Sequence, residues 1–575
     1  MAAARRIWSA PLWAHCLALG LLLATLFPFM SPNGALTSDE GAYALQASAL
    51  RNGSWVYDYK AAPLDPDGRS FPLVMSSRHG DDFYPYVQHP AYPILLSGAS
   101  AVAGATVGLH LLALAGTIGT AAAAWLLAGE VDERLRRPAF WLSALSPTLV
   151  NGYLLWAHTL AAAVAGLTLV ALVRLVRRGP TVRWVVATET GLVAGVMLRS
   201  EGLLFAGAVA MAGALVAWRR PVTFDGTRST SLRRIPIGML RGVRASVAIV
   251  CLAGPAVVAA QLERLWVRQI VGGGYDNLSD RAAGAPWLPG RVAAGWHDLL
   301  QGSDAGSSGQ ALALLALASV VGFGFIALRR WRSDSVRALA IGAAVAVGLT
   351  AVQVLRSPAD SVSGLFAAWP VALLGLILVR WRREGSVVAV LGVTVGLLAF
   401  MVVSTEYPAG GGLEWGGRFF FPVMAPLAVL AVVGIDRRLV AAPVAARFAP
   451  TGLLAAVVLT GALSGVVSAA RVRADVSDLA SAVARHPAPV TVTTVPALPR
   501  VAWTTHSSVN WMLTDPAGLP ELLAGLHARG ITEVAVVTWR PGPGSNATDG
   551  GFSTVEEVGE RALRAHNLGL YVLRQ

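Results

Sequence analysis

Long apolar runs separated by short polar connections fill most of the chain. After a first run from about Trp13 to Met30, further runs lie at about 106–128, 138–153, 156–174, 184–199, 202–218, 245–262, 309–328, 337–355, 362–380, 386–403, 419–435 and 451–470. A helix that crosses a bilayer needs roughly 17 to 25 residues of mostly apolar character. The pattern therefore predicts an α-helical polytopic membrane protein with about 13 transmembrane helices.

The topology depends on one short apolar stretch, from Ala91 to Ala103. Its roughly 13 residues are too few to span, so we expect a juxtamembrane helix within the first outer loop. Cytoplasmic loops of membrane proteins are enriched in arginine and lysine. With 91–103 outside the membrane, all the arginine-rich connections face the cytoplasm: 129–137, 175–183, 219–244, 329–336, 381–385 and 436–450. The first helix is then a retained signal anchor with a cytoplasmic N-terminus.

Composition agrees with this class. Hydrophobic residues make up 55% of the chain and charged residues only 14%, against roughly 25% charged residues in soluble domains. The net charge of +13 comes almost wholly from arginine, because Lys60 is the single lysine. The arginines form short clusters between apolar runs, which is typical of membrane loops and argues against nucleic-acid binding. Cys16 and Cys251 lie in apolar runs without metal-ligand or disulfide spacing, so we interpret them as packing residues.

The character of the chain changes after residue 470. Segments 490–495 (VTVTTV) and 533–538 (EVAVVT) predict strands, 519–530 predicts a helix, and a final helix precedes the closing LGLYVLRQ. We predict a membrane domain over 1–470, with a catalytic outer loop at 31–105, and a small extracytoplasmic α/β domain over 471–575. The second domain shows no recognisable site, and its role stays open.

Two adjacent carboxylates, Asp39 and Glu40, follow the first apolar run directly. Acidic side chains are costly inside a bilayer, so a pair at the exit of a membrane helix is a candidate functional site. A structural alternative exists for Glu40, because Thr37 and Glu40 have the T-x-x-E spacing of a capping box. The helix that they start would end near Asn52-Gly53. Asp39 has no such explanation beyond a weak helix-dipole effect, so it is our candidate for the chemistry.

Arginine is usually found in the cytoplasmic loops of a membrane protein. Three arginines are instead expected near the outer membrane face: Arg199, Arg356 and Arg418. One interpretation is a snorkelling side chain, or an ion pair with a carboxylate such as Glu201 or Glu414. The other is a guanidinium that binds a phosphate in a bidentate manner. The sequence leaves both open.

These segments together resemble a known family. The Asp-Glu pair at a helix start, the HPAYPILL segment that begins at His89 and includes Tyr92, the basic turn LRSEG and the later GGRFFFP are similar to motifs of the C-type membrane glycosyltransferases. Protein O-mannosyltransferases and aminoarabinose transferases are the nearest in style. The resemblance covers about residues 10 to 435. One departure is HPAYP, where many relatives have two prolines directly after the basic residue.

The resemblance implies a hexosyl- or pentosyltransferase of cell-envelope glycosylation. It would move a sugar, with inversion, from a polyprenyl-phosphate donor to a hydroxyl of a protein, lipid or glycan acceptor at the outer face of the cell membrane. Phosphate leaves readily as an anion, so one carboxylate base suffices, with an arginine opposite the developing charge. The implied catalytic residues are Asp39 and Glu40, and the implied substrate-binding residues are Asp81, Asp82, His89, Tyr92, Arg199, Glu201, Glu414 and Arg418.

Two alternatives accompany this hypothesis. We expect no cofactor, but a divalent cation on Asp39, Glu40, Asp81 and Asp82 is a second way to stabilise the phosphate. The rival function is a transporter or a flippase for lipid-linked sugars. Transporters often contain repeated halves whose broken helices meet at the membrane midplane. The sequence has no visible repeat and its carboxylates lie at the outer end, which favours the transferase.

Overall fold

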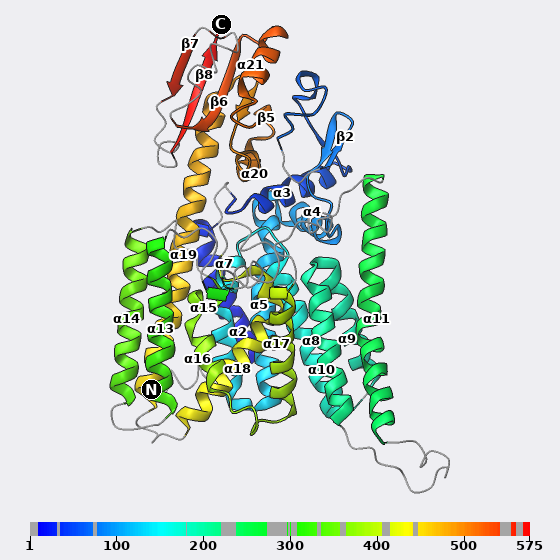
Figure 1. The fold of residues 1–575 in the computed structure, drawn as a ribbon, viewed down its shortest axis with the longest axis vertical. Helices are drawn as coiled ribbons and strands as arrows, with labels where there is room; N and C mark the ends of the chain where they lie inside the picture. Colours follow the sequence, from blue (N-terminus) through cyan, green and yellow to red (C-terminus); the bar gives the residue numbers. More distant parts are fainter. Residues whose placement is uncertain are drawn as a thin grey trace.

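The structure is a computed structural model that describes residues 10–30, 35–72, 77–179, 181–219, 237–272, 307–329, 335–356, 364–404, 415–440, 447–540, 554–558 and 567–575, with 296, 299–300 and 552 as isolated residues. It consists of a helical bundle, a layer of short elements across one end of the bundle, and a sheet domain beyond that layer (Figure 1). The two chain ends lie at opposite ends of the long axis.

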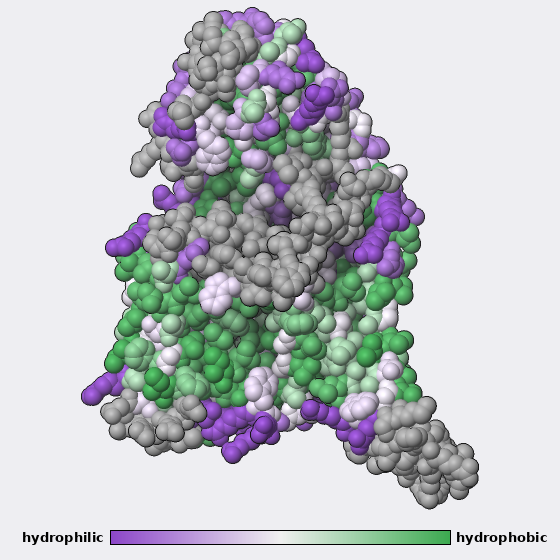
Figure 2. Space-filling model, in the orientation of Figure 1, coloured by the Kyte–Doolittle hydropathy of each residue, from purple (hydrophilic) through white to green (hydrophobic). Residues whose placement is uncertain are grey.

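Within the described residues, ten helices are long and apolar enough to cross a membrane. They are α2 (Leu12–Met30), α5 (Ala105–Val131), α8 (His158–Arg178), α10 (Glu201–Arg219), α11 (Ile237–Val271), α13 (Ser307–Arg329), α14 (Ser335–Arg356), α17 (Ser386–Ser404), η6 with α18 (Arg418–Val423 and Met424–Leu439), and α19 (Phe448–Arg485). Figure 2 shows the apolar belt that they form between two polar ends. The predicted class, a multi-pass helical membrane protein, is confirmed.

Shorter helices occupy the three other predicted crossings. α6 (Arg136–Ala144) and α7 (Thr148–Asn151) fill 138–153, α9 (Val182–Leu198) fills 184–199, and α15 (Leu365–Ala368) with α16 (Pro370–Leu378) fills 362–380. Pro147 and Pro370 stand where the first and last of these segments break, because proline disfavours helical geometry in the residue before it. The count of thirteen crossings is not confirmed and stays a prediction.

The layer across the end of the bundle contains α3 (Ser38–Arg51) and α4 (Ala91–Ala103) (Figure 1). α4 has the bounds expected from the sequence, and its 13 residues are too few to cross a bilayer. A small antiparallel sheet joins the two helices, in the order β1-β3-β2, with β1 at Tyr57–Asp58, β3 at Asp82–Tyr84 and β2 at Ser77–His79. A short turn of 3-10 helix, η1 (Ala62–Leu64), follows β1.

The centre of the bundle is α18, which is buried from Met424 to Ile435. It crosses α16 at glycines. A Cβ atom on Gly434 would lie 1.9 Å from the carbonyl oxygen of Gly375, and one on Gly375 would lie 2.4 Å from the Cα of Ala431. Small residues at a helix crossing allow the two backbones to approach closely. In a membrane this close packing drives helix association, because lipid tails are as apolar as the side chains and the hydrophobic effect contributes little. The glycines therefore set the interhelical distance.

Ion pairs link several arginine-rich loops to one another at the end of the bundle opposite α3. Glu130, at the end of α5, accepts hydrogen bonds from Arg174 and Arg177 at the end of α8. Arg134 pairs with Asp436 at 3.2 Å, and Arg437 pairs with Glu384 at 3.5 Å. The connections near residues 130–137, 174–183, 381–385 and 436–440 thus share one side, as the predicted topology requires.

A single helix, α19, leads from the bundle to the C-terminal domain and continues past the predicted boundary at 470/471 (Figure 1). The domain has a five-stranded sheet in the order β5-β4-β6-β8-β7. The strands are β4 (Thr491–Thr493), β5 (Trp511–Leu513), β6 (Glu533–Trp539), β7 (Thr554–Val558) and β8 (Leu568–Arg574), with helices α20 (Leu498–Val501) and α21 (Leu519–Ala528) and the 3-10 turn η8 (Trp503–Thr505). The predicted α/β character is confirmed.

Candidate active site

Asp39 lies in the first turn of α3, where the bundle meets the C-terminal domain. Its side chain is 30% exposed, and its Oδ2 accepts a hydrogen bond from Nη1 of Arg418 at 3.1 Å. Two glycines with positive φ, Gly416 and Gly417, turn the chain just before Arg418. A Cβ on Gly416 would meet the Pro147 ring at 2.1 Å, so only glycine fits. The sequence segment GGR therefore places a guanidinium beside the candidate base.

Glu40 has different surroundings, although it is the next residue. It is fully buried, and its Oε1 accepts the backbone amides of Leu36 at 2.7 Å and Thr37 at 3.1 Å. Its Oε2 accepts the amide of Leu155 at 3.0 Å and pairs with the buried guanidinium of Arg473 from α19. The glutamate half of the predicted capping box is formed. With both oxygens occupied, Glu40 is placed to fasten α3 to the bundle and to α19.

Arg199 and Glu201 form a forked ion pair at the turn between α9 and α10. Nη2 and Nε of Arg199 lie 2.7 and 3.0 Å from the two carboxylate oxygens. This is the ion-pair alternative that the sequence left open. Arg199 also acts electrostatically on Tyr43 and Tyr86, so its charge faces the same site as Asp39.

His89 stands before α4 in a left-handed backbone conformation, with φ of 51°. Such a conformation is uncommon for a residue other than glycine and occurs often at functional sites. Its Nδ1 lies 2.6 Å from Oε1 of Glu263, in α11. The outer loop is thereby tied to a helix more than 170 positions away in the chain. His89 also acts electrostatically on Glu201, which places it near the Arg199–Glu201 ion pair.

Three tyrosines cluster near Asp39, of which Tyr43 and Tyr92 are buried and Tyr86 is half-buried. The hydroxyl of Tyr43 donates to that of Tyr86 at 2.8 Å, and Tyr92 meets Tyr43 edge to face at 5.2 Å between ring centroids. Burial raises the pKa of all three phenols, most strongly for Tyr86 and Tyr92. They therefore stay protonated at neutral pH and can donate hydrogen bonds but cannot accept a proton.

Three sequence candidates remain: Asp81, Asp82 and Glu414. Asp81 and Asp82 belong to the hairpin of β2 and β3, and the charged groups that act on Asp82 are Asp58, Asp81 and His79 of the same sheet. Burial and the two neighbouring carboxylates raise the pKa of Asp82. Asp39 is not among the charged groups that act on Asp82. Glu414 lies outside the described residues. In the described part of the chain, no group of three or more His, Cys, Asp or Glu side chains could hold a metal ion.

Several residues at the site were not anticipated from the sequence. His158 is buried at the start of α8, neither of its ring nitrogens has a hydrogen-bond partner, and it faces the charges of Arg199 and Arg418. The ring of Trp156 lies 5.8 Å from the Arg418 guanidinium. Arg500, from the C-terminal domain, donates to Ser38. The sequence could have indicated His158 by its position, because it is a polar residue near the start of a predicted membrane helix.

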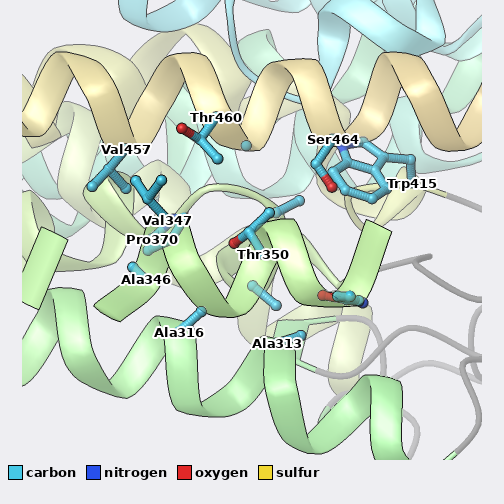
Figure 3. A pocket seen from close by; sticks show the side chains of 14 residues that line it. Ala313, Ala316, Ala346, Val347, Thr350, Pro370, Trp415, Val457, Thr460 and Ser464 are labelled. Atoms are coloured by element: carbon cyan, nitrogen blue, oxygen red, sulfur yellow. The ribbon is translucent and has the colours of Figure 1, made fainter. Parts of the chain in front are cut away.

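A small cavity lies inside the bundle. It lies between α13, α14 and α19, with Thr460 and Ser464 on one wall and Trp415 at its end (Figure 3). Its free space of about 20 Å³ has room for little more than one water molecule. Gln353, whose buried Nε2 has no hydrogen-bond partner, lines the same cavity. A buried water would satisfy this amide.

The chain matches no protein-family model and no curated protein. Its fold is similar to that of ArnT from Cupriavidus metallidurans, with a TM-score of 0.48 in the apo state and 0.49 when bound to undecaprenyl phosphate. Identity is 12% in both cases, over 97% of this chain and 96% or 97% of the other. The archaeal oligosaccharyltransferase AglB from Archaeoglobus fulgidus, in complex with an inhibitory peptide and a dolichol-phosphate, is similar at a TM-score of 0.42. Its identity is 14%, over 91% of this chain and 69% of that one.

Proposed function

We propose that the protein is a membrane glycosyltransferase that moves a sugar from a polyprenyl-phosphate donor to an acceptor hydroxyl, with Asp39 as the general base. One observation carries the proposal: Asp39, partly exposed, lies 3.1 Å from Arg418 at the end of an apolar bundle. A carboxylate can take the proton of an attacking hydroxyl, and a guanidinium can stabilise a departing phosphate. Both groups stand where a lipid-borne phosphate would meet a water-borne acceptor.

The reaction is a single displacement at the anomeric carbon. The acceptor oxygen forms a bond to this carbon while the bond from carbon to phosphate oxygen breaks, and the electron pair leaves with the phosphate. Attack opposite the leaving group inverts the configuration. The acceptor proton passes to Asp39, so its carboxylate becomes neutral as the phosphate gains one negative charge. Polyprenyl phosphate leaves without a general acid.

The change in charge on Asp39 affects Arg418 directly. Before the reaction, Arg418 is hydrogen-bonded to the carboxylate of Asp39. Once the proton has moved, this carboxylate no longer attracts the guanidinium, while the phosphate attracts it more strongly. We propose that Arg418 shifts to the leaving phosphate as the reaction proceeds. Such an interaction, stronger in the transition state than in the ground state, accelerates the reaction.

The same charges support an orientation. The site lies at the end of the bundle away from the gathered arginine clusters, which we place in the cytoplasm. Both the active site and the C-terminal domain would then be extracytoplasmic.

Donor consumption tests the function. The purified protein is incubated with a panel of hexosyl and pentosyl polyprenyl phosphates and a cell-envelope extract as the acceptor source. We expect one donor to release polyprenyl phosphate only when the extract is present, with the sugar recovered on an acceptor in inverted configuration. A flippase or transporter would instead move the intact donor between the leaflets of a vesicle. Translocation without cleavage would overturn the proposal.

A further inference from the structure

The C-terminal domain packs directly on the helix that carries Asp39. The backbone amide of Ala35 donates to the carbonyl of Val501 in α20 at 3.2 Å. Gly41, in α3, lies so close to α20 that a Cβ atom there would come within 1.8 Å of the Arg500 carbonyl oxygen. The contact therefore requires glycine at position 41. α20 sits on the first turns of α3, beside the candidate base.

This contact buries the side chain of Arg500. It is 5% exposed, its Nη1 donates to the Ser38 hydroxyl at a long 3.3 Å, and its Nε is buried without a hydrogen-bond partner. Burial lowers the pKa of Arg500, and the nearby charge of Asp39 opposes this effect. A buried charge without a close partner is costly, so the fold keeps it at the expense of stability.

The other arginines of the site each have a carboxylate partner. Arg199 pairs with Glu201, Arg418 with Asp39, and Arg473 with Glu40. Among the described residues that surround Asp39, Arg500 is thus the guanidinium left without a carboxylate within ion-pair distance. A guanidinium with free donors matches the oxygens of a phosphate, to which it can donate in a forked geometry.

We propose that Arg500 binds the phosphate of the lipid-linked donor, so that the C-terminal domain completes the active site. This inference rests on the proposed function. A sugar-linked polyprenyl phosphate is a phosphodiester with one negative charge, which one free guanidinium can match. Arg500 therefore holds the donor before reaction, while Arg418 is engaged with Asp39. Arg418 becomes available for the second phosphate charge only when Asp39 takes the acceptor proton.

Binding measurements separate this role from turnover. The probe is a polyprenyl monophosphate, compared with the uncharged polyprenol of the same length, on the full-length protein in detergent. We expect the wild-type protein to prefer the phosphate by about tenfold to a hundredfold, the range for a hydrogen bond to a charged group. Arg500→Gln should lose most of this preference, and Arg500→Lys should keep part of it. The matched control is Arg529→Gln, an exposed arginine of the same domain that caps the Gly525 carbonyl.

A second variant tests docking without changing any charge. Gly41→Ala forces α20 away from α3 and should reduce the phosphate preference as Arg500→Gln does. The ratio of the affinity for polyprenyl phosphate to the affinity for polyprenol is an internal reference, because a misfolded protein loses binding of both ligands together. An Arg500→Gln protein that keeps the wild-type preference would overturn the inference. The proposed function fails separately, if Asp39→Asn keeps full turnover.

Discussion

At the start of α3, two neighbouring carboxylates have opposite surroundings. The side chain of Asp39 is 30% exposed and faces Arg418, whereas Glu40 is fully buried against three backbone amides and Arg473. An exposed carboxylate can exchange a proton with a substrate. A buried carboxylate paired with a guanidinium holds the structure, because protonation would leave the guanidinium uncompensated. The adjacent pair thus divides into a candidate base and a structural residue.

Replacing Glu40 should therefore affect stability first. In Glu40→Gln the buried Arg473 loses its counter-charge, and breaking a buried ion pair costs about 3 to 5 kcal/mol. We expect a clearly lower thermal midpoint in detergent, while protein that remains folded keeps much of its turnover. The matched control is Glu133→Gln, whose carboxylate is mostly exposed and pairs with Arg136. Equal midpoints for the two variants would contradict the structural role.

Arg418 should act on the rate more than on donor binding. Because its hydrogen bond goes to Asp39 before the reaction, Arg418→Ala should lower kcat by about 10²-fold to 10³-fold, with a smaller change in KM. Lysine should restore only part of the rate, since it lacks the forked geometry. Steady-state kinetics with the identified donor provide the test. Unchanged kinetics in a folded Arg418→Ala protein would return Arg418 to a snorkelling role.

At the residue scale, the sequence predicted which types of residue form the site better than it predicted which residues contact one another. The T-x-x-E spacing is local, so the capping interaction of Glu40 could be predicted. Its partner Arg473 lies 433 positions away, and Arg500 lies in another domain. No local periodicity encodes such contacts. The Arg199–Glu201 pair was one of the two alternatives that the sequence left open, because its members are two positions apart.

At the scale of elements, the length of an apolar stretch predicted the helix correctly where that length was far from the minimum needed to cross a membrane. The stretch 91–103 is well below a membrane span and forms a short helix with those bounds. The predicted crossings at 138–153 and 362–380 are near the limit, and proline divides both into shorter helices. A pattern of hydrophobic residues alone does not predict where proline divides a helix.

The segment after α20 contains a buried histidine that should make the C-terminal domain sensitive to acid. Burial lowers the pKa of His506 from 6.5 to about 4, while its Nε2 is hydrogen-bonded to the Pro499 carbonyl. Between these two pH values the unfolded chain binds a proton that the folded domain excludes. Stability should therefore fall as pH decreases from about 6.5 towards 4, by up to about 3 kcal/mol.

Limited proteolysis of the domain at a series of pH values measures this effect. His506→Gln keeps a donor for the Pro499 carbonyl but cannot titrate, so its resistance should change less with pH. His527, which is half-buried and bonded to Gln575, serves as the control in His527→Gln. A His506→Gln profile that parallels the wild type across this range would show that other groups are responsible.

For the whole molecule, the distribution of arginine predicts a topology. The loop around Arg233 should be cytoplasmic and the C-terminus extracytoplasmic. Reporter fusions at residues 230 and 575 should therefore report opposite sides of the membrane. Both reporters on one side would mean that the number of crossings, or the status of 91–103, is different.

The arrangement of the two domains could be predicted only in part. The strand and helix patterns after residue 470 indicated an α/β domain, and the sheet has that character. Its contact with α3 depends on Gly41 and the backbone of α20, and a lone glycine in a helix does not indicate what approaches it. The predicted α/β domain packs on α3, beside the candidate base.

The central claim is that Asp39 takes the acceptor proton, and Asp39→Asn tests it most directly. Asparagine keeps the shape of the side chain and suits a helix start, but it cannot accept a proton at neutral pH. Turnover of the lipid-linked donor should fall by about 10²-fold to 10⁴-fold, equivalent to about 3 to 6 kcal/mol of barrier, with an unchanged thermal midpoint. Turnover within about tenfold of wild type, in a protein that is equally stable, would contradict the account.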